Sequence, residues 1–197
     1  KVYRNDKITI AEIEALRRAG AAGRALAWRE PRSFGYARTR GGGREGGGRM
    51  SVPARIYVAS PLGFSQAGRH FYDAVLLPFV RGLGYEVVDP WALADAGRIA
   101  EVEAMPYGAE RRDAWRRLNR EIGASNRAAI DSAGAVVAVL DGVDVDSGTA
   151  AEIGYAFARG KLIVGYRGDF RLSADNEGGA VNLQVEYFIR ESGGTIV

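Results

Sequence analysis

The segment that decides the fold runs from residue 133 to residue 166: AGAVVAVLDGVDVDSGTAAEIGYAFARGKLIVGY. It opens with an almost wholly apolar run over 133–141, which is typical of a strand buried in a parallel sheet. The residues at 148–160 then have helical spacing and end in a glycine, and KLIVGY at 161–166 is a second apolar strand. A strand, a helix and a strand in this order predict a right-handed parallel crossover.

The same alternation continues on both sides of this unit. We expect further strands at 55–60, 84–90 and 195–197, and further helices at 67–83, 91–104, 109–132 and 181–191. Pro78 lies inside one of these helices and predicts a kink there. The pattern predicts an α/β fold that is doubly wound (flavodoxin-like or Rossmann-like), with a mostly parallel five-stranded sheet and helices on both faces. In such sheets, ligands bind beyond the carboxyl ends of the strands.

The charges divide the chain into two regions. Residues 1–50 hold 12 Lys and Arg against 5 Asp and Glu, whereas residues 51–197 hold 15 against 19. A Gly/Arg-rich run, RTRGGGREGGGRM at 38–50, predicts that 1–50 is a flexible basic extension ahead of one folded domain at 51–197. Two interpretations stay open for 1–50: an upstream extension without a fold, or a basic arm that contacts an anionic partner. Because the predicted domain is mildly acidic, we expect it to have no nucleic-acid partner.

The composition excludes several kinds of site. The sequence has no cysteine and one histidine, His70, so a thiolate nucleophile, a Cys-ligated metal and a multi-His metal site are ruled out. We therefore expect no metal and no cofactor. No apolar run approaches the ~20 residues that span a bilayer, which predicts a cytoplasmic protein without a membrane partner.

The acidic loop after the strand at 133–141 carries the most evident chemistry. Asp141, Asp144 and Asp146 follow the strand, and Glu152 comes one turn into the next helix. Because helical side chains point back toward the N-terminus, we expect Asp146 and Glu152 to share a pocket. Two such carboxylates have their pKa values pushed apart, which suits displacement at the anomeric carbon of a sugar. A purely solvated loop remains the alternative, and the spacing lacks the ligand pattern of an EF-hand calcium loop.

Four stretches together resemble one family. DVDSGTAAEIGYAFARGK (144–161) resembles the Asp-x-Gly-Thr-Ala-x-Glu-x-Gly-x-Ala motif of the nucleoside 2-deoxyribosyltransferase family. IYVASPLGF (56–64) is similar to its first strand and base-binding loop, and NRAAIDSAGAVVAVLDG (126–142) to the helix and strand before the motif. VNLQVEYFI (181–189) resembles its Asn-containing C-terminal segment.

The resemblance implies an enzyme, a pentosyltransferase of purine and pyrimidine salvage that needs no cofactor. It would exchange the base of a 2′-deoxynucleoside for a free nucleobase. Glu152 would be the nucleophile that forms a deoxyribosyl ester, so that two inversions give net retention. Asp146 would handle the proton of the nucleobase. Asn182 would reach the site from a neighbouring subunit, which implies a homo-oligomer with shared active sites.

Further residues are candidates for substrate contacts on the same grounds. They lie in the first-strand loop, at the end of the second strand, in the helix before the motif and at the start of the motif helix: Ser60, Gly63, Phe64, Asp89, Asn126 and Gly148. Family members commonly carry an Asp where Asn126 stands. An Asn still forms a hydrogen bond with a sugar hydroxyl, but it cannot act as a base.

Two other functions remain open on the sequence. One is a hydrolase that uses the same Glu152 ester on (deoxy)nucleosides or nucleoside monophosphates and lets water accept the sugar. The first-strand loop has Arg69 as its nearest cation, which favours a nucleoside over a phosphorylated substrate. The other is a nucleotide-binding module without catalysis.

Overall fold

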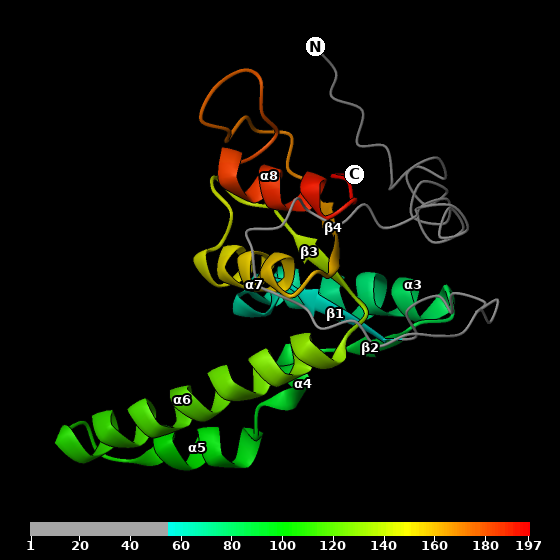
Figure 1. Cartoon of the computed structure of the whole chain (residues 1–197). Helices are drawn as coiled ribbons and strands as arrows, with labels where there is room; N and C mark the ends of the chain where they lie inside the picture. Colours follow the sequence, from blue (N-terminus) through cyan, green and yellow to red (C-terminus); the bar gives the residue numbers. More distant parts are fainter. Residues whose placement is uncertain (1–54) are drawn as a thin grey trace, which may run out of the picture. The chain divides into compact units, whose positions relative to one another are not determined.

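Four parallel strands form the sheet of the computed structural model, which describes residues 55–197. Their order across the sheet is β2-β1-β3-β4 (Figure 1). They are β1 (Arg55–Ala59), β2 (Glu86–Val88), β3 (Ala135–Val139) and β4 (Leu162–Tyr166). β3 lies between two partners, with Ala138 opposite Ala59 of β1 and Gly165 of β4. The predicted basic extension over 1–50 lies outside the described residues.

The fifth strand, expected at 195–197, is not part of this sheet as a strand. Ile196 forms one isolated parallel bridge with Gly165, and the amide of Val197 donates to the Gly165 carbonyl at 2.9 Å. Gly193 has a φ of 85° and turns the chain after the preceding helix, and residues 195–197 then lie beside β4. The described residues therefore form a four-stranded sheet, and the prediction of five strands is not supported.

The helices lie close to the ranges that the sequence predicts. In chain order they are η2 (Leu62–Phe64), α2 (Gln66–Phe71), η3 (Tyr72–Leu76), α3 (Leu77–Gly82), α4 (Pro90–Leu93), α5 (Ala96–Ala104), α6 (Ala109–Ser132), α7 (Ser147–Ala158) and α8 (Leu183–Glu191). The helix expected at 91–104 is divided into α4 and α5. Asp95 causes the break, because its backbone is extended and its carboxylate caps α5 by accepting from the amides of Gly97 and Arg98. None of the described helices is long and apolar enough to cross a bilayer.

The kink predicted at Pro78 takes the form of the π-helical segment η3. There the amide of Leu77 donates to the carbonyl of Tyr72, five residues earlier, instead of four. Proline has no amide hydrogen and its ring crowds the preceding turn, so a wider turn just before it relieves both problems. The segments α2, η3 and α3 consequently run on as one helix.

Each face of the sheet has its own apolar cluster, as the alternation of side chains along a strand requires. On one face Ile56, Val58 and Val139 pack against η3 and α3. On the other face Tyr57 and Val136 pack against α6, α7 and α8. Helices thus cover both faces, which confirms the doubly wound α/β architecture.

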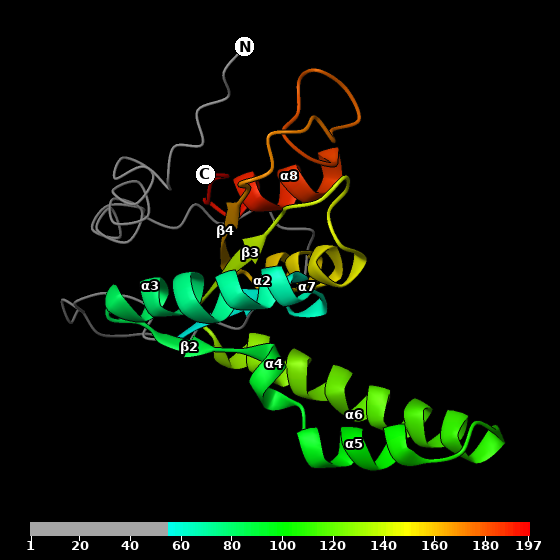
Figure 2. The same ribbon diagram turned by 180° about the vertical axis from the view of Figure 1, so that it is seen from behind.

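α5 and α6 form a helical hairpin that extends beyond the sheet (Figures 1 and 2). α6 has 24 residues and is therefore about 36 Å long. Its C-terminal part contributes Ala129 and Ile130 to the core beside the sheet, whereas its N-terminal part packs with α5.

Candidate active site

A buried hydrogen bond between β1 and α7 is the central contact of the site. The hydroxyl of Tyr57 donates to Oε1 of Glu152 at 2.6 Å. Tyr57 is fully buried in β1, so its ring is fixed and its hydroxyl holds one carboxylate oxygen in place. Glu152 lies in the second turn of α7 and points back toward the sheet, as expected from the direction of helical side chains.

Burial and charge set the proton affinities of this pair. Burial raises the pKa of Glu152, the hydrogen bond from Tyr57 lowers it, and the negative charge of Asp146 raises it again, with a net upward shift. Burial and the neighbouring Glu152 carboxylate raise the pKa of Tyr57 far above its usual range, so the phenol stays protonated. The result is a permanent donor beside a carboxylate that takes up a proton more readily than an ordinary glutamate.

Asp146 is the N-cap of α7. Its Oδ2 accepts from the Thr149 amide at 2.9 Å and from the Thr149 hydroxyl at 3.3 Å. A Cβ on Gly148 would lie 3.1 Å from that Oδ2, so a glycine at this position leaves room for the carboxylate. A cap of this kind stabilises a helix by about 1 kcal/mol. Asp146 therefore fixes the start of α7 and, through its charge, also acts on Glu152.

A reciprocal pair of side chains, Asp141 and Arg167, joins the acidic loop to the segment after β4. Asp141 Oδ1 accepts from the amides of Gly168 and Asp169 at 2.6 and 2.9 Å. In the opposite direction, the guanidinium of Arg167 donates to the carbonyls of Leu140 at 2.5 Å, Gly142 at 3.3 Å and Arg171 at 2.8 Å. We call Asp141 and Arg167 the loop clasp. Asp144, by contrast, is exposed, and among the described residues it accepts only from the Val145 amide.

The loop after β1 is held by Trp91. The indole Nε1 donates to the carbonyl of Ser60 at 3.2 Å, and the Ser60 hydroxyl accepts from the Leu62 amide. A Cβ on Gly63 would lie 2.3 Å from the indole ring, so only glycine allows this approach. Phe64 packs edge-on against the same indole, with ring centroids 4.7 Å apart, and remains 77% exposed. Phe64 thus offers solvent a rigidly held aromatic surface.

Asp89 holds Trp91 and Tyr72 in place through hydrogen bonds. Its Oδ1 accepts from the Trp91 amide at 2.9 Å and from the hydroxyl of the fully buried Tyr72 at 2.8 Å. Burial and the bond to Asp89 raise the pKa of Tyr72 far above its usual range. The Asp89 carboxylate, at the end of β2, therefore bonds to groups of the protein itself and caps α4.

Asn126 lies on α6 and carries a buried oxygen, Oδ1, that has no hydrogen-bond partner among the described residues. A buried acceptor without a donor is costly, by roughly 1–3 kcal/mol, unless something outside the chain supplies the donor. This is the position where the family resemblance implies a sugar contact.

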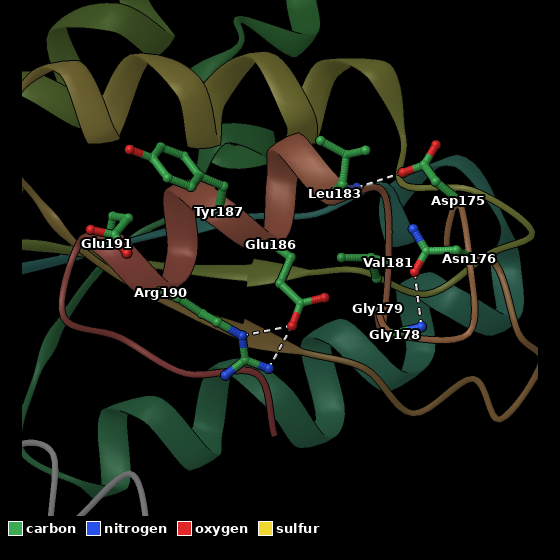
Figure 3. Close-up of a pocket in the computed structure, with 10 residues that line it drawn as sticks. All are labelled: Asp175, Asn176, Gly178, Gly179, Val181, Leu183, Glu186, Tyr187, Arg190 and Glu191. Atoms are coloured by element: carbon green, nitrogen blue, oxygen red, sulfur yellow. Dashed lines mark hydrogen bonds and ion pairs between the residues drawn. The ribbon is translucent and has the colours of Figure 1, made fainter.

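Asn182 is not joined to Glu152 by any interaction within the described residues. Its Oδ1 caps α8 by accepting from the amides of Gln184 and Val185 at 3.0 and 3.4 Å. Beside it, a pocket of about 300 Å³ runs along α8 (Figure 3). Glu186 faces this pocket but is already paired with Arg190 and the Ala180 amide. Neither Tyr57 nor Glu152 lines the pocket, so it is distinct from the candidate active site.

Some of the residues that organise the site carry little signal in the sequence. The structure places Tyr57 in the core, with its hydroxyl on Glu152. Its signal was a lone hydroxyl-bearing side chain in an aliphatic strand. Tyr72 and Arg167 had no comparable signal, because their partners are 17 and 25–27 residues away in sequence.

No group of three or more side chains that could hold a metal ion lies within residues 55–197. Four sets of hydrogen bonds are described above: Tyr57 with Glu152, the Asp146 cap, the loop clasp and the Trp91 support.

Comparison with known proteins places this site in context. A family model described as Nucleoside 2-deoxyribosyltransferase matches residues 56–184. A crystal structure of a conserved protein from Enterococcus faecalis V583 is similar at 25% identity and a TM-score of 0.55, over 73% of this chain and 90% of that one. No curated protein sequence matches.

Two weaker structural similarities involve proteins with named activities. One is a CMP N-glycosidase from Clostridium botulinum, at 19% identity and a TM-score of 0.41, over 73% of this chain and 87% of that one. The other is a 2-deoxyribosyltransferase from the psychrotolerant bacterium Bacillus psychrosaccharolyticus, at 23% identity and a TM-score of 0.42, over 69% and 82%. The family model covers well over half of the sequence, including β1, the acidic loop and Glu152, and the chain therefore belongs to the nucleoside 2-deoxyribosyltransferase family.

Proposed function

We propose that this protein is a nucleoside 2-deoxyribosyltransferase, which exchanges the base of a 2′-deoxynucleoside for a free nucleobase through a deoxyribosyl ester on Glu152. The observation that carries the proposal is the buried bond from Tyr57 to Glu152 Oε1, within the part of the chain that matches the family. A carboxylate held by one oxygen presents its other oxygen in a fixed direction, which is what a nucleophile requires.

In the first half of the reaction, Glu152 Oε2 attacks C1′ of the nucleoside. The C1′–N bond breaks as the C1′–O bond forms, and the departing base takes a proton from Asp146. Asp146 has to be protonated for this step. It is suited to the role because it lies near Glu152 and because its Oδ1, which makes no hydrogen bond within the described residues, is available to carry the proton. In the second half, a nitrogen of the incoming base attacks C1′ and the ester breaks. Asp146 then takes the proton of that base, and the two inversions give net retention.

In this proposal the substrate contacts come from α6, from the loop after β1 and from the start of α7. The orphaned Oδ1 of Asn126 accepts a hydrogen bond from a hydroxyl of the sugar, which supplies its missing donor. The exposed ring of Phe64, held by Trp91, stacks on the nucleobase. Ser60 and Gly63 shape that platform, and Gly148 lets the Asp146 carboxylate approach the start of α7.

A second copy of the chain would complete the site. Asn182 makes no contact with Glu152 of its own chain among the described residues, and its amide nitrogen is not engaged by the α8 cap. In the proposed homo-oligomer, Asn182 reaches the sugar or the Glu152 carboxylate of a neighbour.

The test is an exchange assay on the full chain. Deoxyadenosine or deoxyinosine is incubated with a second base, and the exchanged nucleoside is measured by chromatography. We expect exchange by the wild type and by Asp144→Asn, a matched control in the same acidic loop, and none by Glu152→Ala. Mass spectrometry of a quenched reaction should find the sugar on Glu152.

The other outcomes identify the other functions. Base release that does not depend on an acceptor base would indicate the hydrolase. Tight binding of a nucleoside without exchange, release or adduct would indicate a binding module and would contradict the proposal.

A further inference from the structure

The C-terminal ends of α6 and α7 are tied together by one carboxylate. Asp131 is the penultimate residue of α6, and the hydroxyl of Tyr155 on α7 donates to its two oxygens, each at 3.0 Å. Oδ1 of Asp131 also accepts from Nε of Arg159, the C-cap of α7, at 2.7 Å. These contacts join residues that are 24 and 28 positions apart in the sequence. We call Asp131 and Tyr155 the helix joint.

Lys161, which follows α7, adds bonds to the same end of α6. Its ammonium donates to the carbonyl of Asp131 at 2.9 Å and to the carbonyl of Ala133 at 2.7 Å. Carbonyls at the C-terminal end of a helix have no amide partner within the helix, and a positive charge is favourable beside them. The last turn of α6 is therefore held both through its backbone and through the Asp131 side chain.

The bond from Tyr155 contributes more to the helix joint than the ion pair with Arg159. Tyr155 packs against the core cluster that includes Ala129 and Ile130 of α6, so the position of its ring is fixed. The side chain of Arg159 is 53% exposed, and an exposed ion pair stabilises a protein only weakly. Removal of the Tyr155 hydroxyl should therefore loosen the joint, whereas removal of the Arg159 guanidinium should loosen it much less.

The two helices that meet at the joint carry two side chains of the candidate active site. Both helices end at the joint, so positions can be counted back from it. At 1.5 Å per residue, Asn126 lies about 7.5 Å back along α6 from Asp131, and Glu152 lies about 4.5 Å back along α7 from Tyr155. Asn126 and Glu152 are thus on the same side of the joint, each within about two turns of it.

No direct contact of its oxygen fixes Asn126 relative to the nucleophile. Oδ1 of Asn126 has no hydrogen-bond partner among the described residues, and Glu152 is held from β1 by the Tyr57 hydroxyl. The N-terminal part of α6 packs with α5, beyond the sheet (Figure 1). A side chain bonded to a neighbouring helix prevents its own helix from turning about its axis. The bonds of Asp131 therefore fix the direction in which Asn126 projects from α6.

From these observations we propose that Asp131 and Tyr155 are positioning residues. They fix the rotation of α6 relative to α7, so that Asn126 accepts from a sugar hydroxyl while Glu152 attacks C1′ of the same sugar. This inference rests on the proposed function and extends it to two side chains that act through Asn126 and Glu152. A small displacement of a group that contacts the substrate costs much of its effect, so the joint should control how strongly the sugar hydroxyl is recognised.

The test compares deoxyadenosine with 2′,3′-dideoxyadenosine and 2′,5′-dideoxyadenosine, each with a second base as acceptor. The wild type should prefer deoxyadenosine about 10- to 100-fold in kcat/KM over at least one analogue, because Oδ1 of Asn126 then lacks its donor. Tyr155→Phe and Asp131→Ala should each reduce this preference at least about threefold. Asp131→Asn should retain most of it, since the amide oxygen still accepts from Tyr155.

The ratio between substrates separates positioning from folding. A loss of stability lowers the rate for all three nucleosides equally and leaves the ratio unchanged. Tyr187→Phe on α8 is the matched control, because the Tyr187 side chain is half-exposed and its hydroxyl makes no hydrogen bond within the described residues. This variant should keep the wild-type preference, and Arg159→Gln should keep most of it.

Binding gives a second readout that does not need turnover. Calorimetry on Glu152→Gln chains should show the same preference for deoxyadenosine in Kd, and added Tyr155→Phe should reduce it. If the wild type exchanges no base but binding follows this pattern, the proposed activity is wrong and the positioning role is supported. An unchanged ratio in Tyr155→Phe and Asp131→Ala would overturn the inference even where exchange is intact. A wild type that treats the three nucleosides alike would also overturn it.

Discussion

Glu152 combines burial with the need for a negative charge. Its carboxylate is buried, one of its oxygens accepts from the Tyr57 hydroxyl, and burial raises the pKa of the carboxylate. A raised pKa favours folding only while the group is protonated. The favourable contribution is complete below the pKa of an unfolded glutamate, and it is lost as the pH rises through the higher pKa of the folded protein. At neutral pH, the ionised Glu152 therefore lowers the stability of the protein.

Glu152→Gln should remove activity and raise stability at the same time. Glutamine keeps an oxygen for the Tyr57 hydroxyl but has no charge to bury and cannot form the ester. We expect a Tm roughly 2–5 °C above that of the wild type at neutral pH, with the difference vanishing in acid. Thermal unfolding followed by circular dichroism across this pH range tests the prediction. A variant less stable than the wild type at neutral pH would contradict it.

The pH dependence of kcat/KM should also reflect the bond between Tyr57 and Glu152. In the proposed reaction Glu152 attacks in its ionised form, so kcat/KM should fall on the acid side with an apparent pKa above that of an ordinary glutamate. Tyr57→Phe removes the hydrogen bond that lowers the pKa of Glu152, so the acid limb should move further up. The rate should fall about 10- to 100-fold, since the nucleophile loses its fixed orientation. An acid limb that stays in place in this variant would show that Tyr57 has only a packing role.

At the scale of elements, the site depends on how the segments after β3 and β4 are tied together. The loop clasp joins them in both directions, because each side chain bonds to the backbone of the other segment. The loop between them leads to the Asp146 cap and so to the first turns of α7. The geometry of this loop is set by the hydrogen bonds between these side chains and the backbone of the two segments. No local sequence preference specifies those bonds.

Arg167→Gln should lower kcat about tenfold through misplacement of the acidic loop, with little change in KM. Asp141→Asn should act in the same direction, and the double variant should lose less than the sum of the two, because both changes open the same contact. Arg81→Gln, an exposed change on α3 away from the loop clasp, is the control. Strictly additive losses would mean that Asp141 and Arg167 act separately.

The sequence anticipated the elements better than the contacts between them. The apolar runs located β1, β3 and β4 within one or two residues, and the periodicity of α6 located that helix at both ends. The failures have local causes. Asp95 broke one predicted helix because an aspartate can cap a new helix, and the segment expected as a fifth strand forms only an isolated bridge to Gly165. Tyr57 and Arg167 could not be paired with their partners, since those contacts exist only once the strands lie side by side.

At the scale of the whole molecule, the proposed shared site can be tested by mixing chains. Glu152→Gln chains keep Asn182, and Asn182→Ala chains keep Glu152, so each should be nearly inactive alone. After a one-to-one mixture is unfolded and refolded, about one quarter of the sites should contain both wild-type residues, with activity restored to that level. Chains refolded separately and then combined are the control. If no activity returns on mixed refolding, although the chains assemble, each site is built from a single chain.

The wide turn of η3 also has a consequence for how this protein tolerates changes in length. η3 begins at Tyr72, whose hydroxyl donates to Asp89 and so supports Trp91 and the loop of Phe64. A π turn holds one residue more than an α turn, so deletion of the exposed Ala74 would leave a regular helix that is one residue shorter. The amide of Leu77 would then donate to the carbonyl of Tyr72 across an ordinary α turn, so Tyr72 would keep nearly the same direction relative to Leu77 and Val80, which anchor the helix to the sheet. Removal of one residue at this turn should therefore leave the support of Asp89, Trp91 and Phe64 intact.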